Sequence, residues 1–111
     1  MTDGEEYARQ SMPYRSALEA RWLHLTRVAL PAIARERGYP ITADHCFQRV
    51  FLDNACSGVW YNAISRRPAY RHAPHETLAH AVGLAETVLA EEADLDVLNR
   101  RSLAWRRGRS G

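Results

Sequence analysis

Apolar residues recur along the first third of the chain at intervals of three and four, the spacing that lines one face of an α-helix. They are Leu18, Trp22, Leu25, Ala29 and Ile33. Ser11 is a suitable N-cap and Pro13 suits a first helical turn, so the pattern predicts a helix that begins at Ser11. Gly38 and Pro40 predict its end near Arg37, because glycine favours a left-handed C-cap and proline prevents the helix from resuming.

Proline and glycine mark further breaks in the helical pattern. Pro31 lies inside the first predicted helix and removes the backbone bond to Arg27, so we expect a kink there. A second helix is predicted from Ala43 to Cys56, with Thr42 as its N-cap and Gly58 as its stop.

The rest of the chain predicts two more helices joined by short segments. Residues 59–73 are expected to form a connector with a helical turn around 60–64. A third helix is predicted for residues 74–92, and Asp94 would cap a fourth helix over residues 95–107. No stretch alternates apolar and polar residues as a strand does, so the predicted fold class is all-α, a compact irregular bundle of about four helices.

The apolar faces of these helices predict one shared core. On the last helix, Leu95, Leu98, Ser102 and Trp105 fall on one face at 100° per residue, opposite Arg100. The large side chains expected to be buried together are Trp22, Phe47, Phe51, Leu98 and Trp105.

A chain of 111 residues suits one domain. We expect residues 1–10 to form a polar N-terminal arm, residues 11–107 the helical domain and residues 108–111 a short basic tail. The start of the sequence is acidic and polar, and no apolar run approaches the ~18 residues of a membrane helix. The sequence therefore predicts a cytoplasmic protein with no membrane segment.

The net charge of +2 is small, but it is unevenly distributed along the chain. All 15 basic residues are arginines, which bind carboxylates and phosphates through a bidentate fork. Arginines gather near the C-terminus: Arg100, Arg101, Arg106, Arg107 and Arg109. A GC-rich coding sequence accounts for a high arginine content equally well, so this content alone does not indicate a nucleic-acid partner.

One polar stripe on the second predicted helix combines chemically useful groups. His45, Arg49, Asp53 and Cys56 fall within about 80° of arc at helical spacing. Arg49 would bind an anion, Asp53 would orient Arg49 from four residues away, and His45 is the candidate catalytic acid or base. Three interpretations stay open: an internal salt-bridged stripe that docks the connector or the last helix, a binding site, and a catalytic site.

The cysteines and histidines predict no metal site or cofactor. Cys46 is adjacent to His45, but neighbours on a helix point about 100° apart and do not form a Cys–His pair. No CxxC pair occurs, and the spacing of Cys46 and Cys56 relative to the later histidines fits no zinc finger or ribbon. Both cysteines are expected to be free thiols.

The connector is the most basic internal segment. Arg66, Arg67 and Arg71 surround Tyr70, a combination that would hold phosphates and stack a base. The same residues would also cover an acidic protein surface, where arginine and tyrosine are effective contact residues. A third interpretation is a solvated loop in which Tyr70 fills a gap in the core.

Several segments carry a resemblance to a known family. They are Asp44-His45-Cys46-Phe47-Gln48-Arg49, Leu52-Asp53-Asn54, Arg67-Pro68-Ala69-Tyr70 and Leu98-Asn99-Arg100-Arg101-Ser102-Leu103-Ala104-Trp105-Arg106. Over roughly residues 22–107 the chain resembles a family of short, uncharacterised alphaproteobacterial proteins, some of which carry an automatic label of GNAT-type N-acetyltransferase. The resemblance implies that His45, Arg49, Asp53, Arg67 and Tyr70 belong to one site, and the label implies acetyl-transfer chemistry.

Two functions follow as expectations. The first is a non-enzymatic binding module that engages an acidic partner, either a protein surface or a nucleic acid, through arginines of the connector and the last helix. The alternative is a small enzyme or anion binder, related to acyl or acetyl transfer, in which His45, Arg49 and Asp53 line a cleft. The sequence does not choose between the two kinds of partner and does not indicate an oligomeric state.

Overall fold

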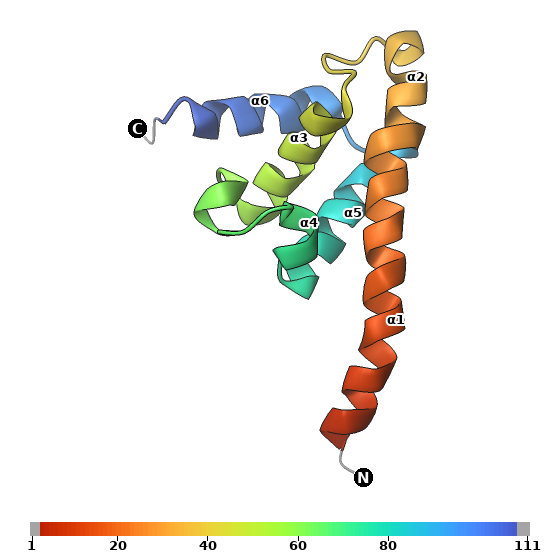
Figure 1. Cartoon of the computed structure of the whole chain (residues 1–111). Helices are drawn as coiled ribbons and strands as arrows, with labels where there is room; N and C mark the ends of the chain where they lie inside the picture. The colour runs from red at the N-terminus through yellow and green to blue at the C-terminus, as the bar shows by residue number, and fades with distance from the viewer. Residues whose placement is uncertain (1–2, 109–111) are drawn as a thin grey trace.

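The computed structural model describes residues 3–108, with side chains from residue 14 onward. Its helical elements are α1 (Asp3–His24), the π-helical turn η1 (Leu25–Ala29), α2 (Leu30–Arg37), α3 (Asp44–Cys56), the 3₁₀ turn η2 (Trp60–Asn62), α4 (Ala69–His72), α5 (His75–Leu89) and α6 (Leu95–Arg106). No strand occurs in this part of the chain, so the all-α prediction is confirmed. Figure 1 shows α1, η1 and α2 as one continuous column, against which α5 and α3 pack, with α6 on the far side of α3.

The first helix begins earlier than the sequence predicted. It starts at Asp3 and not at Ser11, so residues 3–10 extend α1 and do not form a separate polar arm. This segment contains strong helix formers such as Glu5, Glu6 and Ala8, and their propensity prevailed over the cap signal at Ser11. The start of α1 projects beyond the other helices in Figure 1. Residues 1–2 of the predicted arm and 109–111 of the predicted tail lie outside the described residues.

The interruption expected at Pro31 takes the form of the π-helical turn η1. At its end the N–H of Leu30 reaches the carbonyl of Leu25, one residue further back than in an α-helix. Pro31 then lies in the first turn of α2, where a missing N–H breaks no helical bond. Thr26, inside the turn, is buried, and its hydroxyl accepts a bond of 3.0 Å from Gln48 of α3. The wider turn therefore keeps the column continuous and ties it to α3.

Two helix ends agree closely with the cap signals in the sequence. Gly38 terminates α2 with φ of 69°, a left-handed conformation that glycine adopts without strain. Asp94 caps α6 by accepting the Asp96 N–H at 2.9 Å. The predicted Thr42 cap is wrong, because Ala43 occupies the N-cap of α3 and makes no side-chain bond.

One further boundary differs from the prediction, and the connector contains an additional helix. α5 ends at Leu89 and not near Glu92, because Glu91 adopts φ of 62° and its N–H turns back to the carbonyl of Val88. No glycine marks this reversal, so the sequence carries no signal for it. The connector contains the predicted helical turn at η2 and also α4, which the sequence analysis did not anticipate.

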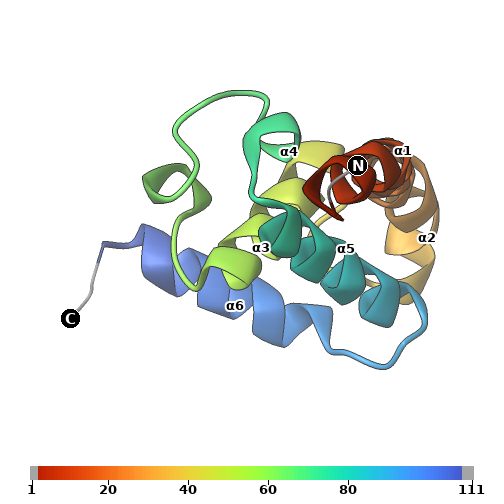
Figure 2. The ribbon, with the colours of Figure 1, turned by 90° about the horizontal axis from the view of Figure 1, so that it is seen from below.

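A cluster of aromatic rings forms the centre of the core. Trp22, Phe47 and Phe51 are essentially inaccessible to solvent. The Trp22 and Phe51 rings meet edge to face with centroids 6.4 Å apart, and Phe47 stacks on Phe51 at 6.3 Å. Leu98 is buried as predicted, but Trp105 is only partly buried, because the carboxyl end of α6 extends past α3 and α5 (Figure 2).

The core is large enough for the bundle to hold together through side-chain packing. The buried apolar residues come from α1, η1, α2, α3, α5 and α6, together with Ile64, Ala69 and Ala73 of the connector. Among residues 3–108, none of the helices has the length and apolar character that crossing a bilayer requires.

Replacing Trp22 or Phe51 with alanine should lower the free energy of unfolding by ~3–5 kcal/mol, because each substitution leaves a cavity in this core. Chemical denaturation followed by circular dichroism measures the effect. Val28→Ala is the matched control, since Val28 is 54% exposed, and it should change stability by less than about 0.5 kcal/mol. A loss below ~1 kcal/mol at both aromatic positions would contradict the packing described here.

Candidate functional site

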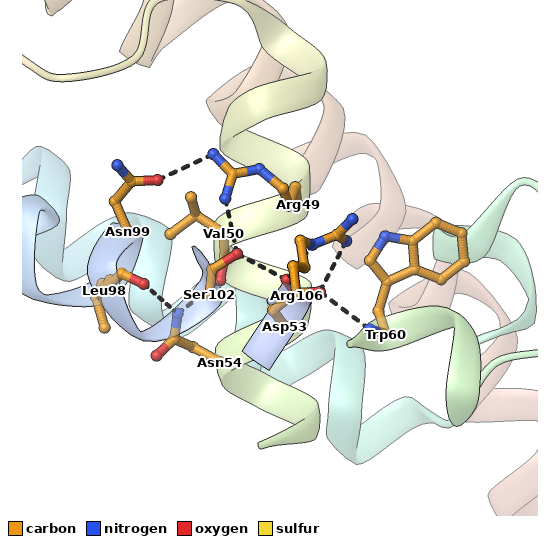
Figure 3. A network of polar contacts seen from close by, with 9 residues as sticks. All are labelled: Arg49, Val50, Asp53, Asn54, Trp60, Leu98, Asn99, Ser102 and Arg106. Carbon is orange, nitrogen blue, oxygen red and sulfur yellow. Dashed lines mark hydrogen bonds and ion pairs between the residues drawn. The ribbon is translucent and has the colours of Figure 1, made fainter. Parts of the chain in front are cut away.

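The carboxylate of Asp53 is the centre of a buried polar network between α3, η2 and α6 (Figure 3). Its side chain has no exposed surface and accepts four hydrogen bonds. Oδ1 accepts from the Trp60 N–H at 3.0 Å and from Arg106 Nη2 at 3.1 Å. Oδ2 accepts from the Ser102 hydroxyl and from Arg106 Nε, each at 2.7 Å. These donors satisfy the buried charge, which would otherwise be costly to remove from water.

Arg49 also contacts α6, but it does not pair with Asp53. Its Nη1 donates to the Ser102 hydroxyl at 2.8 Å, and its Nη2 donates to Asn99 Oδ1 at 2.9 Å. The predicted Arg49–Asp53 pair is therefore wrong. Arg106 reaches the carboxylate with a bidentate fork, and Ser102 lies between Arg49 and Asp53. Arg49 is linked to Asp53 only through that hydroxyl.

A second set of bonds fastens α3 to α6 beside this network. Asn54 Nδ2 donates to the carbonyl of Val50 at 2.8 Å within α3, and to the carbonyl of Leu98 in α6 at 2.9 Å. Figure 3 shows this amide on the same side of α3 as Asp53. The polar stripe thus docks both the last helix and the start of the connector onto α3.

His45 does not join this network. Its side chain is 81% exposed, and its Nδ1 lies 3.6 Å from Asp44 Oδ1. Eight residues separate it from Asp53, a rise of about 12 Å along a helix. The structure therefore does not bring His45 and Asp53 together around one cleft. The contacts of the stripe correspond to a docking element and not to an acid–base pair.

A pocket of about 330 Å³ lies at another place, between the ends of α2 and α5 and the start of α6. Arg37 at its edge donates to the carbonyl of Leu89 at 3.1 Å and to the Tyr39 hydroxyl at 2.8 Å. The hydrogen bond to Tyr39 raises the pKa of Arg37 above its ordinary value. Arg37 caps the carboxyl end of α5 in this way, and no residue predicted for the site lines the pocket.

The connector presents a cluster of alternating arginines and aromatic rings, formed by Arg67, Trp60, Tyr61 and Arg106. The Arg67 guanidinium lies 5.3 Å from the Trp60 ring centroid, and that of Arg106 lies 5.4 Å from the Tyr61 centroid. The two rings meet edge to face at 5.5 Å. Tyr61 is 50% exposed. We call these four residues the arginine–aromatic cluster.

The sequence analysis assigned the aromatic role to Tyr70, and the structure places that residue differently. Tyr70 lies in α4, is half-buried and packs against the core, with the Arg71 guanidinium 5.8 Å from its ring centroid. Arg15 of α1 donates to the carbonyls of Tyr70 and Ala73 at 3.0 and 2.8 Å, which fixes α4 against α1. Tyr70 therefore has the core-filling role that was one of the three alternatives. Arg66, Arg67 and Arg71 are exposed as expected of a contact surface.

Charge is strongly segregated around the cluster. No acidic residue lies between Asp53 and Glu76, and none follows Asp96. Asp53 itself is buried and paired with Arg106. The connector and the end of α6 lie at the same end of the molecule in Figures 1 and 2, and the ring contacts of Trp60 and Tyr61 link Arg67 to Arg106. This absence of acidic residues was visible in the sequence and would have directed attention to Trp60, Tyr61 and Arg106.

The two cysteines are free thiols and both belong to α3. Burial raises the pKa of the Cys56 thiol, and the nearby negative charge of Asp53 raises it further. Among the described side chains, those of residues 14–108, no group of three or more histidine, cysteine or acidic residues is arranged to hold a metal ion.

Comparison of the chain with protein-family models, with curated proteins and with solved structures finds no match in any of the three. The resemblance to the alphaproteobacterial family and its acetyltransferase label therefore stays a prediction. The function is inferred below from the contacts and charges of this chain.

Replacing Asp53 with asparagine should lower the free energy of unfolding by ~3 kcal/mol, because Arg106 loses its counter-charge and the amide cannot accept all four bonds. We place the loss at the lower end of the range for buried pairs, since the Arg106 side chain retains 26% exposure. Urea denaturation at neutral pH measures it. Asp44→Asn is the matched control, at a side chain that is 52% exposed, and equal midpoints for the two variants would contradict a central role for Asp53.

Cys56 should react slowly with a thiol reagent such as Ellman's reagent at neutral pH, because its raised pKa leaves little thiolate. A Cys46→Ser variant isolates its rate. The rate should increase when the protein is unfolded in denaturant, where the thiol regains its ordinary pKa. Equal rates in the folded and unfolded protein would show that neither burial nor Asp53 affects this thiol.

Proposed function

We propose that this chain is a small, non-enzymatic binding module whose basic surface engages an acidic partner. The basic surface consists of Arg66, Arg67 and Arg71 of the connector together with Arg106 and Arg107 at the end of α6. The observation that carries the proposal is the charge segregation around the arginine–aromatic cluster. Two acidic side chains lie near this surface, and both are paired: Asp53 is buried with Arg106, and Glu19, whose charge reaches Arg71, accepts from Arg15.

The small net charge conceals this surface. The molecule carries +2 as a whole, but its acidic residues lie in other elements, such as Asp44 at the start of α3 and Glu86 in α5. Glu86 is also paired, since both oxygens accept from Arg21 at 2.7 Å. A surface of one sign attracts and orients an oppositely charged partner, even when the protein is nearly neutral overall.

The network beneath the surface supports binding because it fixes the arrangement of the contact residues. Asp53 holds the Trp60 backbone and the Arg106 side chain at the same carboxylate. The connector and α6 therefore present their side chains from one rigid base, so less conformational freedom is lost on binding. A small enzyme is less well supported, because the residues predicted for catalysis are separated and Asp53 is fully occupied.

Replacing Arg66 and Arg67 with alanine should weaken retention on immobilised heparin and lower the salt concentration at which the protein elutes. The physical reason is the loss of two positive charges from the basic surface, whose attraction to polyanions is screened by salt. The matched control removes two exposed arginines from the opposite end of the molecule, as Arg27→Ala with Arg35→Ala, and has the same net charge. This control should elute close to the wild type. An equal shift for both variants would show that total charge, and not this surface, determines binding.

A further inference from the structure

We infer that the acidic partner is a single-stranded nucleic acid, whose bases stack on Tyr61 and whose phosphates contact the surrounding arginines. The inference rests on the proposed function and names the partner class for the same surface. Three observations carry it: the exposed ring of Tyr61, the donors left on Arg106, and the absence of an apolar centre in this surface.

Tyr61 offers a stacking platform in a fixed position. It lies in η2 and directly follows Trp60, the first residue of that turn. The N–H of Trp60 donates to the buried Asp53 carboxylate. The turn is closed by bonds from the N–H groups of Ala63 and Ile64 to the carbonyl of Trp60. Half of the Tyr61 side chain nevertheless remains exposed. An aromatic ring held rigidly at a basic surface accepts any base on its face, because every base is a flat π system.

Arg106 places phosphate donors beside that ring. A guanidinium has five N–H donors, and Asp53 accepts from only Nε and Nη2. The group remains 26% exposed while it lies over the Tyr61 ring. Arg67, whose guanidinium lies over the Trp60 ring, and the exposed Arg66 next to it in sequence supply further charge. A strand that runs along the cluster would find phosphate donors beside both aromatic rings.

The composition of the surface favours a nucleic acid over a protein partner. Arginine and tyrosine occur in both kinds of interface, but a protein interface also has a buried apolar centre. Here the centre is charged, and among the described residues the large exposed apolar side chains are Tyr14, Val28, Tyr61 and Leu103. Of these four exposed side chains, Tyr61 is the one that lies in the connector. The other exposed connector residues are the small apolar Ala63 and Pro68 and a set of polar or basic residues: Asn62, Ser65, Arg66, Arg67, Arg71 and His72.

An exposed stacking ring also favours single strands over duplexes. In a duplex the base faces are already stacked on one another, and a protein reaches only their edges and the phosphates. In a single strand the bases are free to lie on aromatic side chains. Tyr61 would therefore contribute to binding of a single strand and contribute nothing to binding of a duplex.

The test is fluorescence anisotropy with a labelled short oligothymidylate and an oligouridylate, a duplex of the same length and poly-L-glutamate. The wild type should bind one or both single strands more tightly than the duplex or the polypeptide. Tighter binding of the oligothymidylate indicates DNA as the partner, and tighter binding of the oligouridylate indicates RNA. Tyr61→Ala should weaken single-strand binding about tenfold, as expected for one lost base stack, and leave duplex binding unchanged. Tyr61→Phe, which keeps the ring, should bind like the wild type.

Tyr14→Ala is the matched control, because Tyr14 is a tyrosine of similar exposure, 59%, whose ring meets His75 of α5 and none of the four cluster residues. If Tyr61→Ala does not fold, Arg67→Ala tests the same surface from an exposed position. That substitution should reduce the salt dependence of single-strand binding by about one phosphate contact.

The outcomes separate the inference from the proposed function. Equal or tighter binding of the duplex or of poly-L-glutamate overturns the single-strand assignment and leaves a binding module for acidic partners in place. Unchanged single-strand binding in Tyr61→Ala overturns the stacking role in the same way. Failure of the wild type to bind any of the four polyanions overturns both.

Discussion

The arrangement of α3, α6 and the connector depends on one buried carboxylate. Asp53 lies at the contact of three segments and has a donor from each of the other two. Burying an ionised carboxylate is unfavourable unless its lone pairs are filled, so the fold must bring Trp60, Ser102 and Arg106 to it. A hydrophobic contact of similar size would tolerate a shifted α6, whereas this set of directed bonds specifies one register for the helix.

Arginine performs this kind of directed bonding throughout the bundle. Arg15 closes the carboxyl end of α4 from α1, and Arg37 closes the end of α5 from α2. The planar, multi-donor guanidinium suits these tasks, since one side chain satisfies carbonyls that a helix end leaves open. The high arginine content noted in the sequence is thus divided between helix-end contacts, the Asp53 network and an exposed basic surface.

The sequence predicted features that local chemistry determines, and missed those that depend on distant partners. Asp94 and the bounds of α6 followed from a cap that acts within three residues. The pairing of Asp53 could not be predicted in this way, because helical spacing identifies Arg49 as its neighbour. The actual partner, Arg106, lies 53 residues away in the sequence. The start of α1 was missed for another reason: Ser11 and Pro13 suit a helix start, but the residues before them are helix formers as well.

Arg106 belongs at once to the interior network and to the outer surface, because it pairs with Asp53 and its guanidinium lies 5.4 Å from the centroid of the half-exposed Tyr61 ring. Under the proposed function, stability and recognition are therefore thermodynamically linked through one side chain. A substitution there that improved contact with a partner would also remove the counter-charge of a buried carboxylate, so the position has little freedom to change during evolution. Exposed neighbours such as Arg66 and Arg107 carry no such constraint, and adaptation to a new partner would proceed through them.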